Sequence, residues 1–441
     1  MLQCQQRLLA RIACLTHDQR IPIGRRMNRS IQDLVIGGGV LGVNCALALA
    51  DAGRSVTLVE QNTVCSGCSH GNAGWVTPCH SLPIPGPGLV YQTLKWMLQG
   101  DSPLYIKPTL RPALWSWLWR FYRHCNEPAQ LRGLRAMAEL NRHVLPLTRE
   151  LVQKHQIDCQ FEQRGITYAF RTETGLQKGI RECERLNDHG IPGEVLSSHE
   201  LRAREPELSD TMCGGVFYPG EADCVPDQFV KQLATRLPRQ GVQILDHTTV
   251  NDYTVQGGRI TEVNTSSGNL HPENIVFAAG AWTLVQGRKL GLRLPVEPAK
   301  GYSVTLKRQA GTPHNPLNLA EAKVGVTPWR DTIRLAGTME LAGLQLKINE
   351  RRVAAIVRAA KEYLPHFAAA EPLETWTGMR PLCSDGLPII GRSQRFDNLL
   401  IATGHGMLGL TQSVASAQII ARLVVGGDPG LDVTPFAPDR R

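Results

Sequence analysis

Residues 34–42 read Leu-Val-Ile-Gly-Gly-Gly-Val-Leu-Gly and are followed, after an alanine-rich segment, by Val-Thr-Leu-Val-Glu at 56–60. The apolar run at 34–36 is long enough for a buried parallel strand and too short for a helix. The glycines have the G-x-G-x-x-G spacing, and helical sequence continues to Gly53, where a helix stop is expected. This order of strand, glycine-rich turn, helix and strand predicts a βαβ unit that binds a dinucleotide.

Each part of the unit has a physical role. Gly37 permits the tight turn, Gly39 lets a pyrophosphate approach the backbone, and Gly42 allows the helix to pack closely on the strand. The helix N-terminus offers N–H groups and the positive end of its dipole to the phosphates. Glu60 ends the second strand, where its carboxylate can accept hydrogen bonds from a ribose hydroxyl. The motif by itself leaves NAD and FAD open.

Length and composition indicate an ordinary soluble protein of two domains, because 441 residues exceed the usual size of one core. The net charge of +9 comes without a run of five basic residues, so a solvated surface is expected and no nucleic-acid partner. The cysteines lie scattered in apolar contexts, such as Cys45 and Cys159, which predicts free thiols in a reducing compartment. Cys65 and Cys68 form one C-x-x-C, which is expected in a cofactor-side loop, and no metal site is expected.

The first 30 residues are rich in Arg and Gln, poor in acids and without the apolar core of a signal peptide. We expect a disordered or non-native leader, with Met27 as another possible start and a mitochondrial-type presequence as the alternative. No run of about 20 apolar residues could span a membrane. Residues 110–125 concentrate Trp, Tyr and Arg. We expect a helix packed on its own protein, and the alternative is an interfacial element at a membrane surface.

Hydrophobic periodicity predicts the other elements. Helical spacing predicts a short helix over 91–99, a helix over 110–125 and one long helix over 129–156. After Cys159 the pattern favours strands mixed with helices. The expected strands are 166–170, 214–218, 242–245, 249–255, 259–265, 274–282, 300–307, 323–327, 332–338 and 399–403. The expected helices are 174–189, 226–237, 349–363 and a final helix after 404–412.

Three further motifs follow the glycine-rich unit in order. They are Phe-Ala-Ala-Gly-Ala-Trp at 277–282, Arg-Pro-x-x-x-Asp-Gly-x-Pro-Ile-Ile-Gly at 380–391 and Thr-Gly-His-Gly-Met-Leu-Gly-Leu-Thr at 403–411. Together with the first unit they resemble the D-amino-acid oxidase superfamily of FAD-dependent oxidoreductases, from about residue 31 to the end. The loop Ser-His-Gly-Asn-Ala-Gly-Trp-Val-Thr-Pro at 69–78 and Leu-Lys-Trp-Met at 94–97 resemble its bacterial D-amino-acid dehydrogenase branch.

The resemblance implies an α/β fold whose Rossmann-like FAD-binding domain is interleaved with a mixed-sheet, α+β substrate domain. Residues 31–90, 222–294 and 375–441 would form the FAD-binding domain, and residues 91–221 and 295–374 the substrate domain. It implies FAD rather than NAD, held without a covalent bond. The implied cofactor-binding residues are Gly37, Gly39, Val40, Leu41, Gly42, Glu60, Gln61, Ser69, His70, Asn72, Ala73, Gly74, Val250, Ala279, Gly280, Gly404, His405, Gly406, Met407, Gly409, Leu410 and Thr411.

The resemblance also implies an activity, the oxidative deamination of D-amino acids. Hydride would pass from the substrate Cα to flavin N5, the imine would be hydrolysed to a 2-oxo acid, and a quinone or another electron-transfer partner would take the electrons. The alternatives are a D-proline or D-hydroxyproline dehydrogenase, a glycine- or sarcosine-type amine oxidase, an RNA-associated flavin module and a non-catalytic flavin-binding subunit. A cytoplasmic protein is expected, with contact to the inner face of the cytoplasmic membrane through residues 110–125 as an alternative.

Three side chains are candidates for the substrate site. Arg380 is expected to bind the substrate carboxylate, because its planar fork matches a carboxylate; a structural ion pair with Asp385 is the alternative. Tyr302 could donate a phenolic hydrogen bond to the same carboxylate, or be a packed strand tyrosine. Arg334 lies on a strand that faces the flavin in the related superfamily. Sarcosine oxidases have a lysine near this position that promotes reaction with oxygen, so an arginine implies a dehydrogenase.

Overall fold

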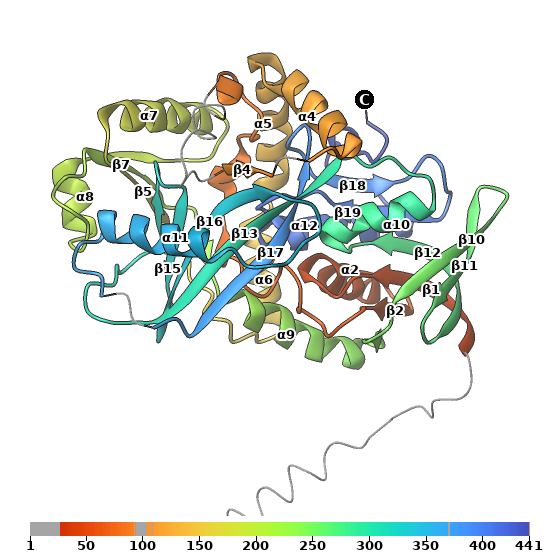
Figure 1. The fold of residues 1–441 in the computed structure, drawn as a ribbon. Coiled ribbons are helices and arrows are strands. Elements are labelled where there is room, and N and C mark those ends of the chain that lie inside the picture. The colour runs from red at the N-terminus through yellow and green to blue at the C-terminus, as the bar shows by residue number, and fades with distance from the viewer. Residues whose placement is uncertain (1–26, 92, 94–103, 108, 369–370, 441) are drawn as a thin grey trace, which may run out of the picture.

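The computed structural model describes residues 27–91, 93, 104–107, 109–368 and 371–440. In Figure 1 the chain forms two neighbouring sheets with helices packed around them. The expected motif at 94–97, nearly all of the expected helix at 91–99 and residues 1–26 of the expected leader lie outside these ranges. Residues 27–30, also assigned to the leader, instead begin strand β1 and pair with residues 268–271 of β12.

The first sheet carries the glycine-rich unit. Within the described ranges it has eight strands in the order β10-β11-β12-β1-β2-β9, with β19 beside β12 and β18 beside β19. Strands β9, β2, β1, β12 and β19 run parallel, as a dinucleotide-binding sheet requires. The bounds are β1 Met27–Ile36, β2 Val56–Val59, β9 Gln243–Leu245, β10 Val250–Gln256, β11 Arg259–Thr265, β12 Gly268–Phe277, β18 Ile389–Arg392 and β19 Leu399–Thr403.

Two helices with small, apolar contact faces cover this sheet. Helix α2 (Val40–Asp51) follows the glycine-rich turn and packs against α12 (Gly409–Val424), the final helix of the chain. Helices α9 (Pro226–Arg236) and α10 (Thr283–Lys289) complete the domain. Helices α2 and α12 therefore share one core, which places the first and the last sequence motifs beside each other.

The second sheet is mixed. Within the described ranges it has nine strands in the order β17-β13-β16-β15-β14-β5-β7-β6, with β4 beside β16. Figure 1 shows α7, α8 and α11 around it. The strand bounds are β4 Leu104–Ile106, β5 Ile166–Phe170, β6 Glu194–Ser197, β7 Gly214–Tyr218, β13 Val296–Lys307, β14 Leu317–Leu319, β15 Val324–Pro328, β16 Thr332–Leu341 and β17 Glu374–Cys383. The helix bounds are α7 Glu173–Asn187, α8 Ser198–Arg204 and α11 Glu350–Tyr363. A short pair, β3 (Trp75–Val76) and β8 (Ala222–Asp223), links the two domains.

The predicted α/β fold with two interleaved domains is confirmed, and most predicted elements lie within two residues of the observed ones. The long helix expected over 129–156 is wrong. It is divided into α5 (Glu127–Asn141) and α6 (Val144–Lys154). Pro146 explains the break, because its ring clashes with the carbonyl of residue 142 in a continuous helix and it has no N–H to donate there.

The domain borders also differ from the expected ones in two places. Strand β17, assigned in advance to the FAD-binding domain, pairs with β13 of the second sheet along its whole length. Helices α5 and α6, assigned to the substrate domain, contribute Met137, Leu140 and Val144 to the core of the first domain. Hydrophobic spacing identifies a buried face but does not say which core buries it.

A buried ion pair holds the first sheet together at its centre. Asp33 on β1 is fully buried and accepts hydrogen bonds of 2.7 and 2.8 Å from the Arg54 guanidinium, which stands just before β2. Asn274 on β12 donates to the same carboxylate at 2.9 Å. The carboxylate therefore joins three neighbouring strands.

Replacing this carboxylate tests the role of the pair. Asp33→Ala leaves Arg54 with only the exposed Glu273 carboxylate at 3.4 Å and removes the acceptor of Asn274, so we expect a loss of about 1–3 kcal/mol of unfolding free energy in urea. Asp51→Ala is the matched control, because Asp51 pairs with Lys154 at 2.9 Å on the surface and should cost no more than about 1 kcal/mol. Equal losses for the two variants would contradict a structural role for the buried pair.

Candidate cofactor and substrate site

A single large cavity of about 1430 Å³ lies between the two sheets. Its lining includes the turns after β1, β2 and β12 of the first sheet, the loop at 65–73, and strands β5, β7 and β13–β17 of the second sheet. It continues past the turn before α12 and along helix α4 (Pro112–His124). The glycine-rich turn and two of the three candidate substrate residues, Tyr302 and Arg380, therefore share one continuous space.

The glycine-rich turn has the close approaches that its sequence predicts. Gly37 has φ +115°, and a Cβ there would lie 2.7 Å from the Ala278 carbonyl oxygen. A Cβ at Gly42 would lie 1.7 Å from the Gly37 carbonyl oxygen. Only glycine fits at these two positions, because any side chain would push the turn away from β12 or from α2.

Glu60 is already oriented at the rim of this turn. One carboxylate oxygen accepts from the Gly38 N–H at 2.7 Å and the other from the Asn62 N–H at 3.0 Å. Each carboxylate oxygen has a second lone pair, so the group can still accept hydrogen bonds from a ligand. Val250 and Lys289 lie further along the cavity, and the Lys289 ammonium donates to the Val250 carbonyl at 3.0 Å.

The loop at 70–73 is bound to the second sheet by all four of its carbonyls. Arg334 donates to the carbonyl oxygens of His70 (3.3 Å) and Asn72 (3.0 Å). Ser303 Oγ donates to the Gly71 carbonyl at 2.7 Å. Thr327 Oγ1 donates to the Ala73 carbonyl at 2.8 Å. The loop is therefore held along its whole length by side chains from β16, β13 and β15.

This arrangement leaves backbone donors for a ligand. The N–H groups of Gly71, Asn72 and Ala73 bond to no acceptor in the part of the chain that the structure describes, and all three residues line the cavity. Ser69 joins the loop to the helix N-terminus, since its Oγ accepts from the Val40 N–H at 2.8 Å. The loop and the start of α2 thus form one continuous set of polar backbone groups.

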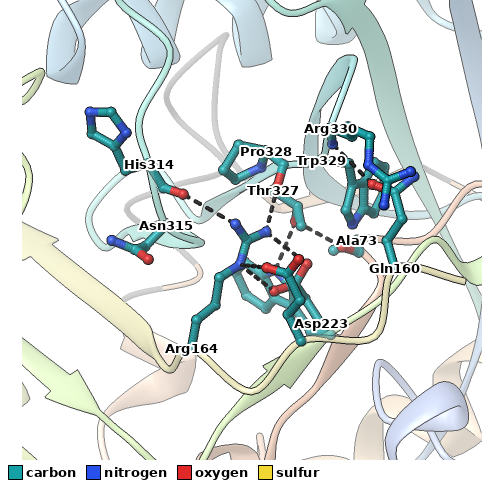
Figure 2. Close-up of polar contacts among 12 residues, drawn as sticks. Ala73, Gln160, Arg164, Asp223, His314, Asn315, Thr327, Pro328, Trp329 and Arg330 are labelled. Carbon is teal, nitrogen blue, oxygen red and sulfur yellow. Dashed lines mark hydrogen bonds and ion pairs between the residues drawn. The ribbon is translucent and has the colours of Figure 1, made fainter. Parts of the chain in front are cut away.

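An ion pair at the junction of the domains fixes the strands that hold this loop (Figure 2). Arg164 binds both carboxylate oxygens of Asp223 on β8, at 2.8 and 3.0 Å. It also donates to the carbonyls of His314 and Pro328. Thr327, next to Pro328 on β15, reaches the Ala73 carbonyl in the same view. Burial raises the pKa of the Asp223 carboxyl, and Arg164 offsets part of this rise.

The turn before α12 closes the cavity from the carboxy-terminal side. Gly404 and Gly406 have φ of +77° and +56°, and the Gly406 N–H donates to the Pro381 carbonyl at 2.9 Å, which pairs His405 with Leu382. His405 lines the cavity, and its Nε2 lies 2.9 Å from Ser416 Oγ, whereas its fully buried Nδ1 has no hydrogen-bond partner among the described residues. Burial lowers the pKa of His405 to about 3, so the imidazole is neutral near pH 7.

Arg380 projects into the same cavity from β17. Its Nη1 donates to the Thr338 carbonyl at 2.9 Å, and a Cβ at Gly301 would lie 1.9 Å from that nitrogen. Thr338 has φ +62°, which is rare for a β-branched residue, and stands at an irregularity in the pairing of β13 with β16. Burial lowers the pKa of Arg380. The alternative ion pair with Asp385 is wrong, because Asp385 binds Arg440 at 2.7 and 3.1 Å.

The other two substrate candidates are engaged elsewhere. Tyr302 is 1% exposed and donates its phenolic proton to Glu340 at 2.6 Å, so binding a substrate carboxylate would require exchange of this bond. Arg334 does not line the cavity; it lies behind the loop at 70–73, and its guanidinium is 5.0 Å from the centre of the Trp329 ring. An inference about oxygen reactivity from Arg334 therefore has no geometric basis here.

The structure brings most of the expected cofactor residues together around the cavity and leaves four of them outside its lining. His70 points to Glu374, at 2.7 Å from its carboxylate. Thr411 Oγ1 bonds to the Trp75 carbonyl and the Thr77 amide. Gly42 and Gly74 provide close packing instead, since a Cβ at Gly74 would lie 2.1 Å from the Cys224 carbonyl oxygen. The remaining expected cofactor residues line the cavity.

Sequence reasoning missed several lining residues. Thr338 and Lys323 adopt left-handed backbone conformations, which their residue types do not predict. The sequence pattern predicts the strands of the second sheet but not which of their residues face a cavity. The missed lining residues include Trp75, His80, Tyr168, Tyr218, Trp282, Gln286, Lys289, Asn318, Lys323, Ala336, Thr338 and Trp376.

A family model and curated relatives match nearly the whole chain. The model described as DAO, FAD dependent oxidoreductase, matches residues 34–423. A D-amino acid dehydrogenase of Bradyrhizobium diazoefficiens is 33% identical over 417 residues, covering 92% of this chain and 98% of that protein. A D-amino acid dehydrogenase of Methylobacterium nodulans is 35% identical over 403 residues, covering 90% and 96%.

Solved structures share the fold at lower identity. Glycine oxidase from Geobacillus kaustophilus has a TM-score of 0.76 and 22% identity, and covers 94% of this chain and 100% of its own. L-proline dehydrogenase from P. horikoshii has a TM-score of 0.72 and 18% identity, with 93% and 98% covered. At these identities the likeness is one of fold.

The residues present fit FAD. The glycine turn and Glu60 match the needs of a pyrophosphate and a ribose, and the same cavity is lined by His405 and by residues 71–73, whose three amides are unbonded within the described chain. The glycine turn and Glu60 would hold the ADP half of FAD, and residues 71–73 with His405 would hold the flavin half.

The ribose contact can be tested by FAD titration. Glu60→Ala removes a charged acceptor, so we expect FAD affinity to fall about 10- to 100-fold, measured by flavin fluorescence quenching in the apoprotein. Thr63→Ala is the control, because Thr63 is exposed and does not line the cavity. Unchanged affinity in the Glu60 variant would show that this carboxylate does not bind the cofactor.

Proposed function

The chain belongs to the DAO family of FAD-dependent oxidoreductases, and we propose that it is a dehydrogenase that deaminates D-amino acids. The curated relatives at 33–35% identity, named D-amino acid dehydrogenase, support this substrate class. The observation that carries the proposal is the position of Arg380. Its guanidinium faces the cavity, and none of the described carboxylates forms an ion pair with it.

Arg380 is the proposed anchor of the substrate carboxylate. A guanidinium offers two parallel N–H groups to a carboxylate, and only one Arg380 N–H···O bond is made within the described protein. The Thr338 carbonyl and the space above Gly301 hold the guanidinium in place. Its partial burial strengthens the attraction, because few water molecules compete for the carboxylate.

The proposed reaction removes two electrons from the substrate. FAD, when bound, supplies the chemistry by accepting the hydride of the Cα–H bond. The amino nitrogen loses one proton, the C–N bond becomes a C=N bond, and water hydrolyses this imine to a 2-oxo acid and ammonia. The described residues orient the substrate for this step and exclude water around it.

We also propose that a quinone accepts the electrons and that α4 contacts the membrane from which it comes. Trp115, Trp119 and Tyr122 are 60%, 62% and 55% exposed and follow one face of α4. Arg120 and Arg123 are exposed beside them, and residues 110–125 contain no acidic residue. Aromatic rings with cations suit the headgroup region of an anionic bilayer. Of the described helices, none has both the length and the apolar character needed to cross a bilayer.

The opposite face of α4 is fixed to the protein, which supports a rigid docking surface. Trp117 is 6% exposed and its indole N–H lies 3.1 Å from the Pro295 carbonyl and 3.2 Å from the Leu382 carbonyl. Arg111 pairs with the buried Glu297 at 2.7 Å. Trp115 and Tyr122 also line the cavity, so an acceptor that arrives along this helix would reach the cofactor space.

Anaerobic reduction of the bound flavin tests the substrate and its anchor. We expect D-alanine to bleach the flavin and L-alanine not to, and Arg380→Ala to lower kcat/KM for D-alanine about 10- to 100-fold. Arg395→Ala is the control, because Arg395 is exposed and donates to the Gly291 carbonyl away from the cavity. Wild-type kinetics in the Arg380 variant, at equal FAD content, would refute the anchor. Faster reoxidation of the reduced protein by oxygen than by a soluble quinone would refute the dehydrogenase.

Sedimentation with lipid vesicles tests the membrane contact. The double variant Trp115→Ser with Trp119→Ser should bind vesicles of anionic phosphatidylglycerol about tenfold more weakly, because both side chains lose apolar area for insertion. Leu373→Ser is the control, since Leu373 is 63% exposed on another part of the surface. Equal vesicle binding by all three proteins would exclude α4 as the contact.

A further inference from the structure

A single row of directly opposed residues crosses seven strands of the second sheet. Opposed residues project from the same face of a sheet. Six of the seven residues of this row line the cavity. The row consists of Trp376, Ser303, Ala336, Gly325, Asn318, Tyr168 and Val216, on β17, β13, β16, β15, β14, β5 and β7. One wall of the cavity therefore extends from the strand of Arg380 to the opposite side of the sheet.

The far end of this row is polar and incompletely bonded. Asn318 Oδ1 is buried and has no partner among the described residues. The Tyr168 hydroxyl lies 2.6 Å from His80 Nε2, and the two rings meet edge-on at 6.2 Å. Burial and the charge of Lys323 lower the pKa of His80 to about 4, so its imidazole is neutral near pH 7. His80 Nδ1 also lies 3.4 Å from Thr77 Oγ1, so among these groups only Asn318 Oδ1 lacks a partner within the described chain.

Lys323 places a positive charge in the same corner. It stands in the turn between β14 and β15 with φ +54°, an unfavourable conformation for a residue with a side chain, and it lines the cavity. The two carboxylates whose charges act on Lys323, those of Glu321 and Glu182, have other partners. Glu321 accepts the Tyr363 hydroxyl at 2.6 Å, and Glu182 pairs with Lys178 at 3.9 Å. Lys323 is an exposed residue of the cavity lining, and no ion pair joins it to a carboxylate of the described chain.

The adjoining rim of the cavity is also mainly positive. Helix α7 contributes Lys178, Arg181 and Arg185 to the lining, together with Glu182. Arg185 pairs with Glu127 at 3.1 Å, whereas Arg181 is exposed. Several cations around one opening raise the local concentration of anions.

The distance between this corner and Arg380 suits one small molecule. The Arg380 guanidinium reaches across β13 to the Thr338 carbonyl on β16. Asn318 lies two strands further along the sheet and level with Ala336, two residues from Thr338, which gives about 12 Å at about 4.8 Å per strand and about 3.3 Å per residue. An α-amino acid with a short acidic side chain spans this distance when a hydrogen bond of about 2.9 Å is added at each end.

We propose that Lys323, Asn318 and the His80–Tyr168 pair form the subsite for the substrate side chain, and that it selects D-amino acids whose side chain ends in a carboxylate. The Lys323 ammonium binds the side-chain carboxylate, and the Asn318 amide, which can turn by half a rotation, hydrogen-bonds to it. Two cations then bind the two carboxylates of the substrate: Arg380 binds the α-carboxylate and Lys323 the side-chain carboxylate. This inference rests on the proposed function, since it specifies the substrate of the same site.

The test compares D-glutamate with D-glutamine, which has the same shape without the charge, and uses D-alanine as the reference. In anaerobic flavin reduction by the holoenzyme, we expect kcat/KM for D-glutamate to exceed that for D-glutamine about tenfold or more. Lys323→Gln should bring the ratio to about one and leave D-alanine unchanged. Lys361→Gln is the control, because Lys361 is exposed on α11, outside the cavity lining.

A binding measurement makes the result independent of turnover. Glutarate, which cannot be oxidised, should perturb the absorbance of the bound flavin in the wild type and bind at least about tenfold more weakly to Lys323→Gln. Equal use of D-glutamate and D-glutamine by the wild type, at normal D-alanine activity, would overturn the subsite and leave the proposed function intact. An equal loss for D-alanine in Lys323→Gln would also overturn it, because the lysine would then serve the α-carboxylate. Absence of flavin reduction by every D-amino acid would refute the proposed function itself.

Discussion

The fold depends on four consecutive carbonyls, those of residues 70–73, that accept hydrogen bonds from side chains of a sheet in the other domain. The loop follows the second strand of the dinucleotide unit, and its donors come from strands 230 residues or more further along the chain. Because every carbonyl is engaged with the second sheet, the amides of 71–73 stay available to the cavity. The two domains therefore cannot separate without exposing the cofactor site.

Packing around this loop explains why several charged side chains are structural. Arg334 and Arg164 each bind backbone carbonyls at the junction, and both are joined to a carboxylate, Glu374 or Asp223. An arginine suits this role because its five N–H groups lie in one plane and can reach several acceptors at once. Arg380 differs from them. It faces the cavity with one backbone acceptor, and this difference in bonding separates an arginine that holds the fold from one that can hold a ligand.

The cavity has ends of different chemical character. Along α4 it is aromatic and opens beside an exposed Trp and Tyr face, whereas at β14 and β5 it is polar and positively charged. A molecule that dissolves in lipid and a charged amino acid would thus approach the cofactor from different sides. Neutral His80 and His405, kept uncharged by burial, add hydrogen-bonding capacity without adding further positive charge. Such a division would suit the proposed transfer of electrons from an amino acid to a lipid-soluble acceptor.

The sequence by itself determined the dinucleotide unit, the family and most elements, because residues 34–60 and strands such as 166–170 and 399–403 carry local patterns that act over a few residues. It also predicted Arg380 and the cofactor turns through motifs, and the structure lines one cavity with them. It could not place Arg334 behind the loop, divide the long helix near Pro146, or join Asn318, Tyr168 and Lys323 in one corner. Those outcomes depend on strand register, on left-handed backbone at Thr338 and Lys323, and on which core covers an apolar face. Only the tertiary structure decides them, since each joins residues that are far apart in the chain.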